Sequence, residues 1–138
     1  MPTIRDLYAQ LESSLGAAVS RLGGPADFRP SFATVPNPEL GDLAIPCFAL
    51  RGQLSALDEK ARNNPGAIAA ALANALEEPA VERAQAAGPY LNLRLRGEDL
   101  ARTVIGDALT HGERFGAPSD GAVREHVVIE FSAPNTNK

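Results

Sequence analysis

The stretch Gly88-Pro89-Tyr90-Leu91-Asn92-Leu93-Arg94-Leu95-Arg96 decides the fold, because apolar and polar side chains alternate along it. Successive side chains of a β-strand point to opposite faces of the sheet, so the three leucines share one face, which we expect to line the core. The other face carries Tyr90, Asn92, Arg94 and Arg96. The turn at Ala87-Gly88-Pro89 predicts an antiparallel hairpin between strands at 80–86 and 90–95.

Helical patterns flank this hairpin on both sides. Apolar residues spaced three or four apart predict a helix over 3–22 that begins at an N-cap, Thr3. Further predicted elements are a short strand at 32–35, a helix from Pro46 to about residue 60, a helix that begins at Asn64-Pro65, and a helix over 98–112. The pattern predicts an α+β domain, a small antiparallel sheet covered by helices.

Composition narrows the class of protein. No apolar run among the 138 residues is long enough to span a membrane, so no membrane partner is expected. The single cysteine, Cys47, excludes an internal disulfide and predicts a reducing, cytoplasmic location, and we expect it in the core. One cysteine and two histidines do not make a zinc site of the usual spacing, so no metal site is predicted. The net charge of −4 means that any RNA contact must be local.

The polar face of the 90–95 strand is the best candidate site within the domain. Tyr90 could stack on an unpaired base, Asn92 could bond to a base edge, and Arg94 and Arg96 could neutralise phosphates. The alternative is that this face is simply the solvated side of an antiparallel sheet.

Three other features have structural interpretations. Gly41-Asp42 is expected to serve backbone geometry and capping rather than a ligand. His111 lies near a predicted helix C-terminus, where a cation favours the helix dipole. Acidic pairs such as Glu77-Glu78 are expected to face solvent.

The end of the chain suggests a second site. Val127-Val128-Ile129 predicts a buried strand, and the polar segment 130–138 would lie at its carboxyl end, where open α/β sheets bind ligands. Glu130 could meet a cationic ligand, Asn135 offers a donor and an acceptor, and Lys138 could meet a phosphate. The alternative is a turn, with Glu130 in water. We expect 113–124 to link two domains, and the chain to be a fragment ending at the start of a nucleotide-binding domain.

Three segments together resemble arginyl-tRNA synthetases. Residues 128–138 resemble the segment before the His-x-Gly-His signature of that family, 37–44 its Gly-Asp segment, and 88–93 its Gly-Pro-aromatic strand. The resemblance implies an N-terminal domain over 1–115 that recognises the D loop of arginine tRNA. It further implies a linker over 116–124, and the first strand and loop of a truncated catalytic domain over 125–138.

The resemblance also implies residue roles. Tyr90 and Asn92 match the aromatic and amide residues of the family's D-loop contact, although Ala87 stands where that family can have Asn. Glu130 and Asn135 match arginine-binding residues, and Lys138 matches a residue near the ATP phosphates; Ala133 replaces a frequent Ser.

The whole enzyme would activate arginine with ATP, with Mg²⁺ as the expected companion, and transfer it to arginine tRNA. We expect this chain alone to be inactive, with no catalytic residue and no cofactor of its own. We also expect residues 126–131 to pair with another chain or to dock on their own domain, since unpaired strand edges seek partners. The alternatives are a free-standing RNA-binding module and a small-molecule regulatory α+β domain.

Overall fold

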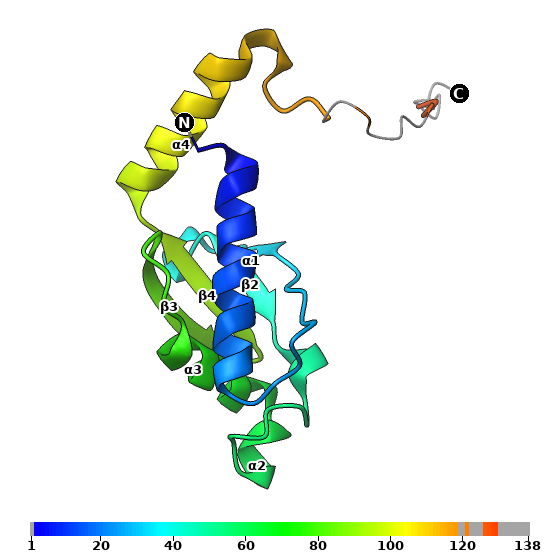
Figure 1. Ribbon diagram of the computed structural model, residues 1–138, viewed down its shortest axis with the longest axis vertical. Coiled ribbons are helices and arrows are strands. Elements are labelled where there is room, and N and C mark those ends of the chain that lie inside the picture. Colours follow the sequence, from blue (N-terminus) through cyan, green and yellow to red (C-terminus); the bar gives the residue numbers. More distant parts are fainter. Residues whose placement is uncertain (1, 119–120, 122–125, 130–138) are drawn as a thin grey trace, which may run out of the picture.

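Strand β4 (Tyr90–Leu95) lies inside a four-stranded antiparallel sheet of order β1-β2-β4-β3 (Figure 1). The other strands are β1 (Ala33–Thr34), β2 (Leu43–Pro46) and β3 (Val81–Ala87). The predicted hairpin is confirmed as β3 and β4, which turn at Gly88 with a φ of 56°. The computed structural model describes residues 2–118, 121 and 126–129, and the predicted α+β class is confirmed within them.

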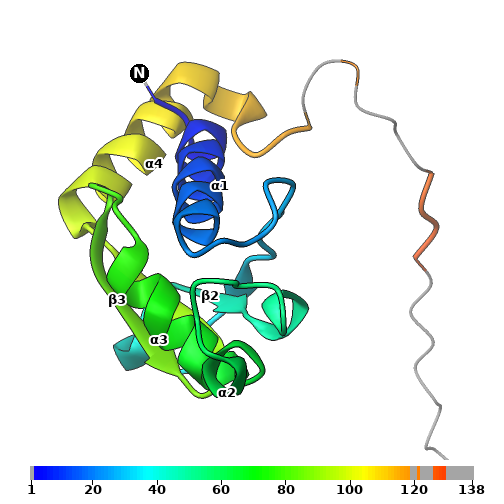
Figure 2. The same ribbon diagram turned by 60° about the horizontal axis from the view of Figure 1, so that its bottom comes forward.

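Two helices cover one face of the sheet (Figures 1 and 2). They are α1 (Ile4–Arg21), which has the predicted Thr3 cap, and α3 (Pro65–Ala75), which is capped by Asn64. Between them and the sheet lies the core, to which the two helices contribute Leu7, Leu11, Leu15, Ala18, Val19, Ile68, Ala69 and Leu72, and the sheet contributes Ile45, Leu91, Leu93 and Leu95. The leucine face of β4 is therefore buried as predicted.

The remaining helices lie at the two ends of the domain. The four-residue helix α2 (Glu59–Arg62) is at one end, and α4 (Gly97–His111) is at the other, beside the start of α1 (Figure 1). Short 3₁₀ turns are η1 (Pro38–Leu40), η2 (Phe48–Leu50) and η3 (Gly112–Arg114).

The predicted helix from Pro46 to about residue 60 is wrong. Residues 43–46 form β2, which pairs along its length with β4, and only the η2 turn and the short α2 follow. As a strand, Leu43, Ala44 and Ile45 form backbone hydrogen bonds with β4, and a helix at this position would lose them. Pro46 is tolerated because β1 reaches only the first two residues of β2 and leaves its far side unpaired.

One acidic side chain is buried against expectation. Glu78 is only 8% exposed and accepts hydrogen bonds from Gln10 Nε2 at 2.6 Å and Ser14 Oγ at 2.5 Å, both on α1. It also accepts from the Ala80 amide at 2.9 Å. This carboxylate ties α1 to the segment that enters β3, because a buried charge is stable only when its oxygens are hydrogen-bonded.

The predicted terminal strand is not confirmed. Its described part, residues 126–129, has no strand, and the side chains of Val127, Val128 and Ile129 are 71%, 93% and 71% exposed. Such high exposure means that these residues do not dock on the domain. They form no strand because an apolar run becomes a buried strand only when neighbouring strands pair with it. Pairing with another chain stays a prediction, as do the domain boundaries at 115 and 125.

Gly41 and Asp42 hold β2 against β4. Gly41 has a φ of 139°, and a Cβ at this position would lie 2.7 Å from the carbonyl oxygen of Leu93. The Asp42 amide donates to that same oxygen at 2.7 Å, and the Asp42 carboxylate accepts from the Leu95 amide at 2.8 Å. The expected backbone role of Gly41 is confirmed, whereas Asp42 extends the strand ladder instead of capping a helix.

Cys47 is confirmed as a core residue, completely buried directly after β2. Burial raises the pKa of its thiol to about 11, because the thiolate would lose its hydration. The thiol is therefore protonated at neutral pH and unsuited to nucleophilic chemistry.

We predict that Gly41→Ala destabilises the domain by about 2 kcal/mol or more, because the new Cβ adds a backbone clash to an unfavourable φ. The matched control is Gly97→Ala, since a Cβ at Gly97 meets nothing within 4 Å and φ there is not positive. The control should stay within about 1 kcal/mol of the wild type. Urea denaturation monitored by circular dichroism measures both, and equal stabilities would remove Gly41 from the β2–β4 junction.

Candidate nucleic-acid interface

The face of β4 that points away from α1 and α3 carries Tyr90, Asn92 and Arg94, because the leucines between them face the core. The predicted division of the strand into a core face and an outer face is therefore present. The structure places the four predicted residues in different surroundings, however, and only Tyr90 and Asn92 remain as neighbours at one end of this outer face.

Asn92 is not the solvated side chain that alternation predicted. Only 4% of the residue is exposed, because β4 is an internal strand and Asn92 lies between Ala44 of β2 and Gln85 of β3. Its carboxamide makes no hydrogen bond to any described residue, yet no polar side-chain atom of the described chain is both sealed from solvent and without a partner. The amide nitrogen and oxygen therefore keep some contact with solvent, and neither bonds to a described residue.

Tyr90 lies at the β2–η2 end of the same face and is 39% exposed. Its ring packs edge-to-face with Phe48 of η2, with centroids 6.0 Å apart and planes at 89°. Phe48 is itself 54% exposed. The sequence reasoning missed Phe48 because it assigned this residue to a helix, and no local pattern sets an exposed aromatic apart from a core one.

Arg94 is tied to the turn that precedes β2. One of its terminal guanidinium nitrogens donates to the Pro38 carbonyl, and Arg83 of β3, opposite Arg94 in register, donates to the Glu39 carbonyl at 3.1 Å. The two arginines thus hold η1 against the outer face of the sheet. Arg94 keeps further donors, but its principal contact is structural.

Arg96 lies beyond the strand. It is the N-cap residue of α4, and its Nε donates to the Pro79 carbonyl at 2.7 Å. Six residues of extended chain separate it from Tyr90, about 20 Å. One nucleotide cannot contact both side chains, so the tRNA-binding role of Arg96, which stays a prediction, would involve a different nucleotide from the one at Tyr90.

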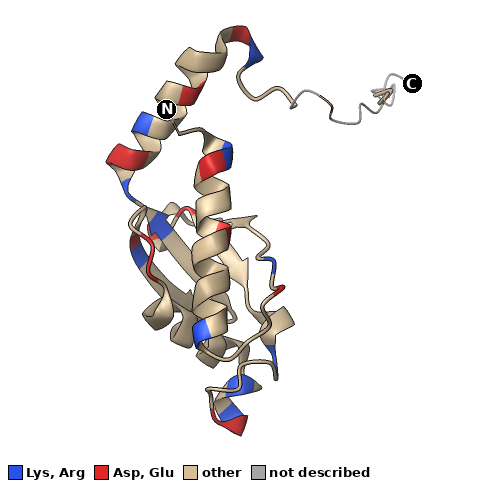
Figure 3. Cartoon of the chain, viewed as in Figure 1, with Lys and Arg blue, Asp and Glu red and all other residues tan. Residues whose placement is uncertain are grey.

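Charge along the described chain is mixed. Basic residues lie on β3 and β4 and around α2, with acidic residues among them (Figure 3). Charge of both signs on the domain provides no broad cationic surface for a polyanion, which fits the prediction that an RNA contact would be local.

The second predicted site falls outside the described residues, because Glu130, Asn135 and Lys138 lie in 130–138. Within the described part of the chain, no three His, Cys, Asp or Glu side chains gather in a way that could hold a metal ion. The same residues include no helix long and apolar enough to cross a membrane.

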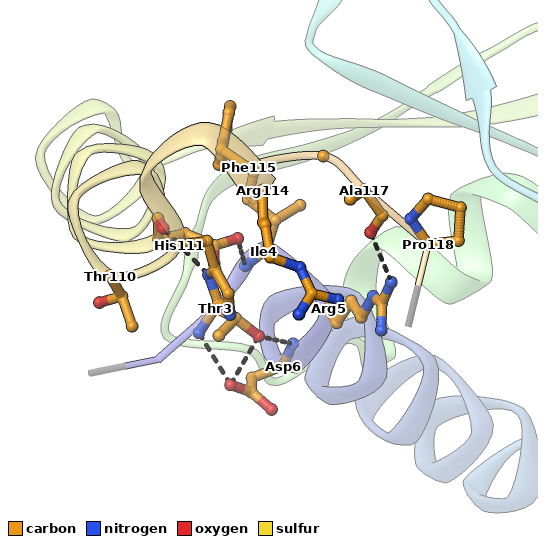
Figure 4. A pocket seen from close by; sticks show the side chains of 12 residues that line it. Thr3, Ile4, Arg5, Asp6, Thr110, His111, Arg114, Phe115, Ala117 and Pro118 are labelled. Atoms are coloured by element: carbon orange, nitrogen blue, oxygen red, sulfur yellow. Dashed lines mark hydrogen bonds and ion pairs between the residues drawn. The ribbon is translucent and has the colours of Figure 1, made fainter. Parts of the chain in front are cut away.

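A pocket of about 640 Å³ lies where the start of α1 meets the end of α4 (Figure 4). The Asp107 carboxylate accepts from the Ile4 amide at 3.1 Å and lies 2.7 Å from His111 Nδ1. Arg5 donates to the Ala117 carbonyl at 3.3 Å, across the pocket. These contacts join the two helices, so we assign them a structural role.

The Thr3 cap borders the same pocket. Its hydroxyl and amide donate to the Asp6 carboxylate, each at 2.8 Å, and these bonds hold the pKa of Asp6 below its usual value. His111 accompanies Asp107 near the C-terminus of α4, which agrees with the dipole interpretation of this histidine.

The class of this protein is an α+β domain that carries an aromatic and an amide on the outer face of its β3–β4 hairpin. A model of the arginyl-tRNA synthetase N-terminal domain family matches residues 9–95. The arginine–tRNA ligase of Clostridium perfringens is 37% identical over 103 residues, and that of Treponema pallidum is 31% identical over 144 aligned positions. These alignments cover 75% and 98% of this chain, and 17% and 23% of the two ligases.

The solved structure of Thermus thermophilus arginyl-tRNA synthetase shares the fold with a TM-score of 0.59 and 36% identity. The likeness covers 72% of this chain and 16% of that protein. The chain therefore belongs to the arginyl-tRNA synthetase N-terminal domain family, as its three sequence segments predicted. It spans less than a quarter of the length of each of these three relatives.

We predict that Asp107→Ala destabilises the domain by about 1–2 kcal/mol, because the Ile4 amide loses its acceptor and the α1 dipole loses a nearby anion. The control is Asp99→Ala, which removes an exposed pair with Arg102 at 3.4 Å and should cost about 0.5 kcal/mol or less. Urea denaturation compares the variants. Equal losses would mean that Asp107 does not join α1 to α4.

Proposed function

We propose that this domain binds the D loop of arginine tRNA and that Tyr90 and Asn92 together hold one unpaired base. The observation that carries the proposal is the unused carboxamide of Asn92, which is almost buried, lacks a partner in the described chain and lies two residues from an exposed ring. Its donors and acceptor are not used by the described chain, so they are available to a ligand that covers this face.

The positions of Tyr90 and Asn92 suit two different contacts with the same base. Side chains at i and i+2 of a strand stand about 7 Å apart on the same face, a separation that a single base can bridge. A base stacked on Tyr90 would present its edge toward Asn92, and an amide can pair with a donor and an acceptor of that edge. Tyr90 would supply affinity for any base, and Asn92 would supply the choice among bases.

In this proposal Arg94 and Arg96 have secondary roles. Arg94 is partly used in holding η1, and Arg96 lies past the end of the strand. Both would act through long-range attraction to phosphates rather than by contact with the base on Tyr90.

The whole protein, by extension from its relatives, is an arginine–tRNA ligase of the cytoplasm that activates arginine with ATP and loads it onto arginine tRNA. The chain spans 17% of the Clostridium relative, so these activities would reside largely outside it, and the chain alone would be inactive. Glu130 and Asn135 would bind arginine, and Lys138 an ATP phosphate accompanied by Mg²⁺. These roles rest on the family resemblance of the terminal segment alone.

The two alternatives receive less support. The relatives carry this domain within ligases, which disfavours a free-standing RNA-binding module. A small-molecule regulatory domain predicts a deep apolar pocket, whereas the pocket between α1 and α4 mixes apolar side chains such as Phe115 with charged ones of both signs, among them Arg5 and Asp107.

We predict that Tyr90→Ala weakens binding of an arginine tRNA transcript by about 1–3 kcal/mol, or roughly tenfold to a hundredfold, the range for one stacked base. Tyr90→Phe keeps the stacking ring and should bind within about threefold of the wild type. Fluorescence anisotropy measures Kd for the 138-residue chain, and kcat/KM for tRNA tests the whole ligase. Unchanged values for Tyr90→Ala in both assays would contradict the proposal.

We predict that Asn92→Ala changes base preference without unfolding the domain. Because the carboxamide makes no internal hydrogen bond, its removal should alter the free energy of unfolding by about 1 kcal/mol or less. Discrimination between transcripts that differ at one D-loop base should fall by about threefold to tenfold, the value of one lost hydrogen bond. A large loss of stability with unchanged discrimination would make Asn92 a structural residue.

A further inference from the structure

Phe48 is an exposed aromatic residue whose position the fold enforces. Its neighbours Cys47 and Leu50 are buried, whereas Phe48 itself is 54% exposed. The backbone around it is fixed at both ends, since the Cys47 amide donates to the Pro89 carbonyl at 3.0 Å and the Arg51 amide donates to the Phe48 carbonyl at 3.2 Å. Leaving an aromatic ring in water is unfavourable, and a ligand that covers the ring would remove this cost.

The two exposed rings form a corner. Phe48 and Tyr90 meet at 89°, so their faces look in perpendicular directions and cannot both stack on one base. A base that stacks on Tyr90 leaves the outer face of Phe48 open to a second one. Consecutive unstacked nucleotides of an RNA loop can splay in this way, and aromatic side chains are their usual platforms.

Arg51 is the C-cap residue of η2, three positions after Phe48. A 3₁₀ turn brings residues i and i+3 to the same side, so Arg51 follows Phe48 on one side of η2. Its Nε donates to the Asn63 carbonyl at 3.1 Å, which anchors the guanidinium, and neither terminal nitrogen has a partner among the described residues. No carboxylate of the described chain pairs with Arg51. An anchored, unpaired guanidinium fork matches the geometry of a phosphate.

We propose that Phe48 and Arg51 form a second nucleotide subsite next to the one at Tyr90. The base adjacent to that on Tyr90 stacks on Phe48, and Arg51 binds the phosphate of the same nucleotide. This inference rests on the proposed function, since it extends the D-loop contact from one nucleotide to two. An exposed aromatic could also dock another protein domain, but the unpaired guanidinium beside it favours a polyanion.

The first experiment measures binding of an arginine tRNA transcript to the 138-residue chain across a range of salt concentrations. Phe48→Leu keeps an apolar side chain and removes the flat ring, so affinity should fall about fivefold to a hundredfold with an unchanged salt dependence. Arg51→Gln should lower affinity mainly at low salt and reduce the slope of log Kd against log salt by about 0.7, the value for one lost phosphate contact on a single strand.

Matched controls lie at the far end of the domain from η2. Phe115→Leu changes an aromatic residue that is 41% exposed, and Arg102→Gln removes an exposed guanidinium of α4. Both should bind tRNA as the wild type does. Phe48→Trp restores a stacking ring and should recover the affinity lost in Phe48→Leu, which a merely structural role for Phe48 in supporting Tyr90 would not require.

A second experiment tests direct contact. p-Benzoylphenylalanine placed at position 48 should crosslink to the D loop of the transcript on irradiation. The same residue in place of Ile105, an exposed residue of α4, should not. The whole ligase carrying the probe at position 48 should give the same RNA adduct. A crosslink to protein instead would assign Phe48 to a domain interface and overturn the subsite.

The outcomes separate the two proposals. If Tyr90→Ala weakens binding while Phe48→Leu and Arg51→Gln behave as their controls, the second subsite is refuted and the base contact at Tyr90 stands. If the wild-type chain and the whole ligase bind tRNA no better than their Tyr90→Ala variants do, both proposals fail together.

Discussion

The antiparallel pairing of β2 with β4 is the constraint on which the rest of the domain depends. Asp42 holds the two strands together at the end where β2 begins, because its amide and its carboxylate both bond to the backbone of β4. Gly41 allows the close approach that these bonds require. With β2 in place, β4 becomes an internal strand, its leucines face α1 and α3, and Tyr90 meets Phe48 at the end of the sheet.

The same pairing explains why the outer face of the sheet is only partly open. Arg94 and Arg83 bind the carbonyls of η1 and hold this turn against the sheet, so each of the two guanidinium groups uses at least one donor in the fold. Asn92 is enclosed by its neighbouring strands but acquires no partner. The exposed rings of Tyr90 and Phe48 lie together at the β2–η2 end of the sheet, and this is the part of the outer face to which we assign the proposed contact with tRNA.

Local physical chemistry accounts for the elements that the sequence predicted correctly. The helix of α1 follows from its apolar spacing and its Thr3 cap, and α3 follows from Asn64 and Pro65, since capping and periodicity act within a few residues. The alternation at 90–95 and the turn at Gly88 likewise specify a hairpin. Strand β2 was missed and a helix was predicted from Pro46, because a short apolar run carries no local sign of its distant partner, β4.

The sequence by itself determined the hairpin, the two capped helices, the buried leucine face and the family. Each of these depends on the spacing of apolar residues or on short segments of adjacent residues. Tertiary structure alone decided which polar side chains were left for a ligand. The deciding contacts join residues that lie 7 to 56 positions apart in the sequence. They set the exposure of Asn92, the use of Arg94 and Arg96 in backbone contacts, and the packing of Phe48 on Tyr90. Such contacts arise only when the sheet closes, and no local pattern of side chains encodes them.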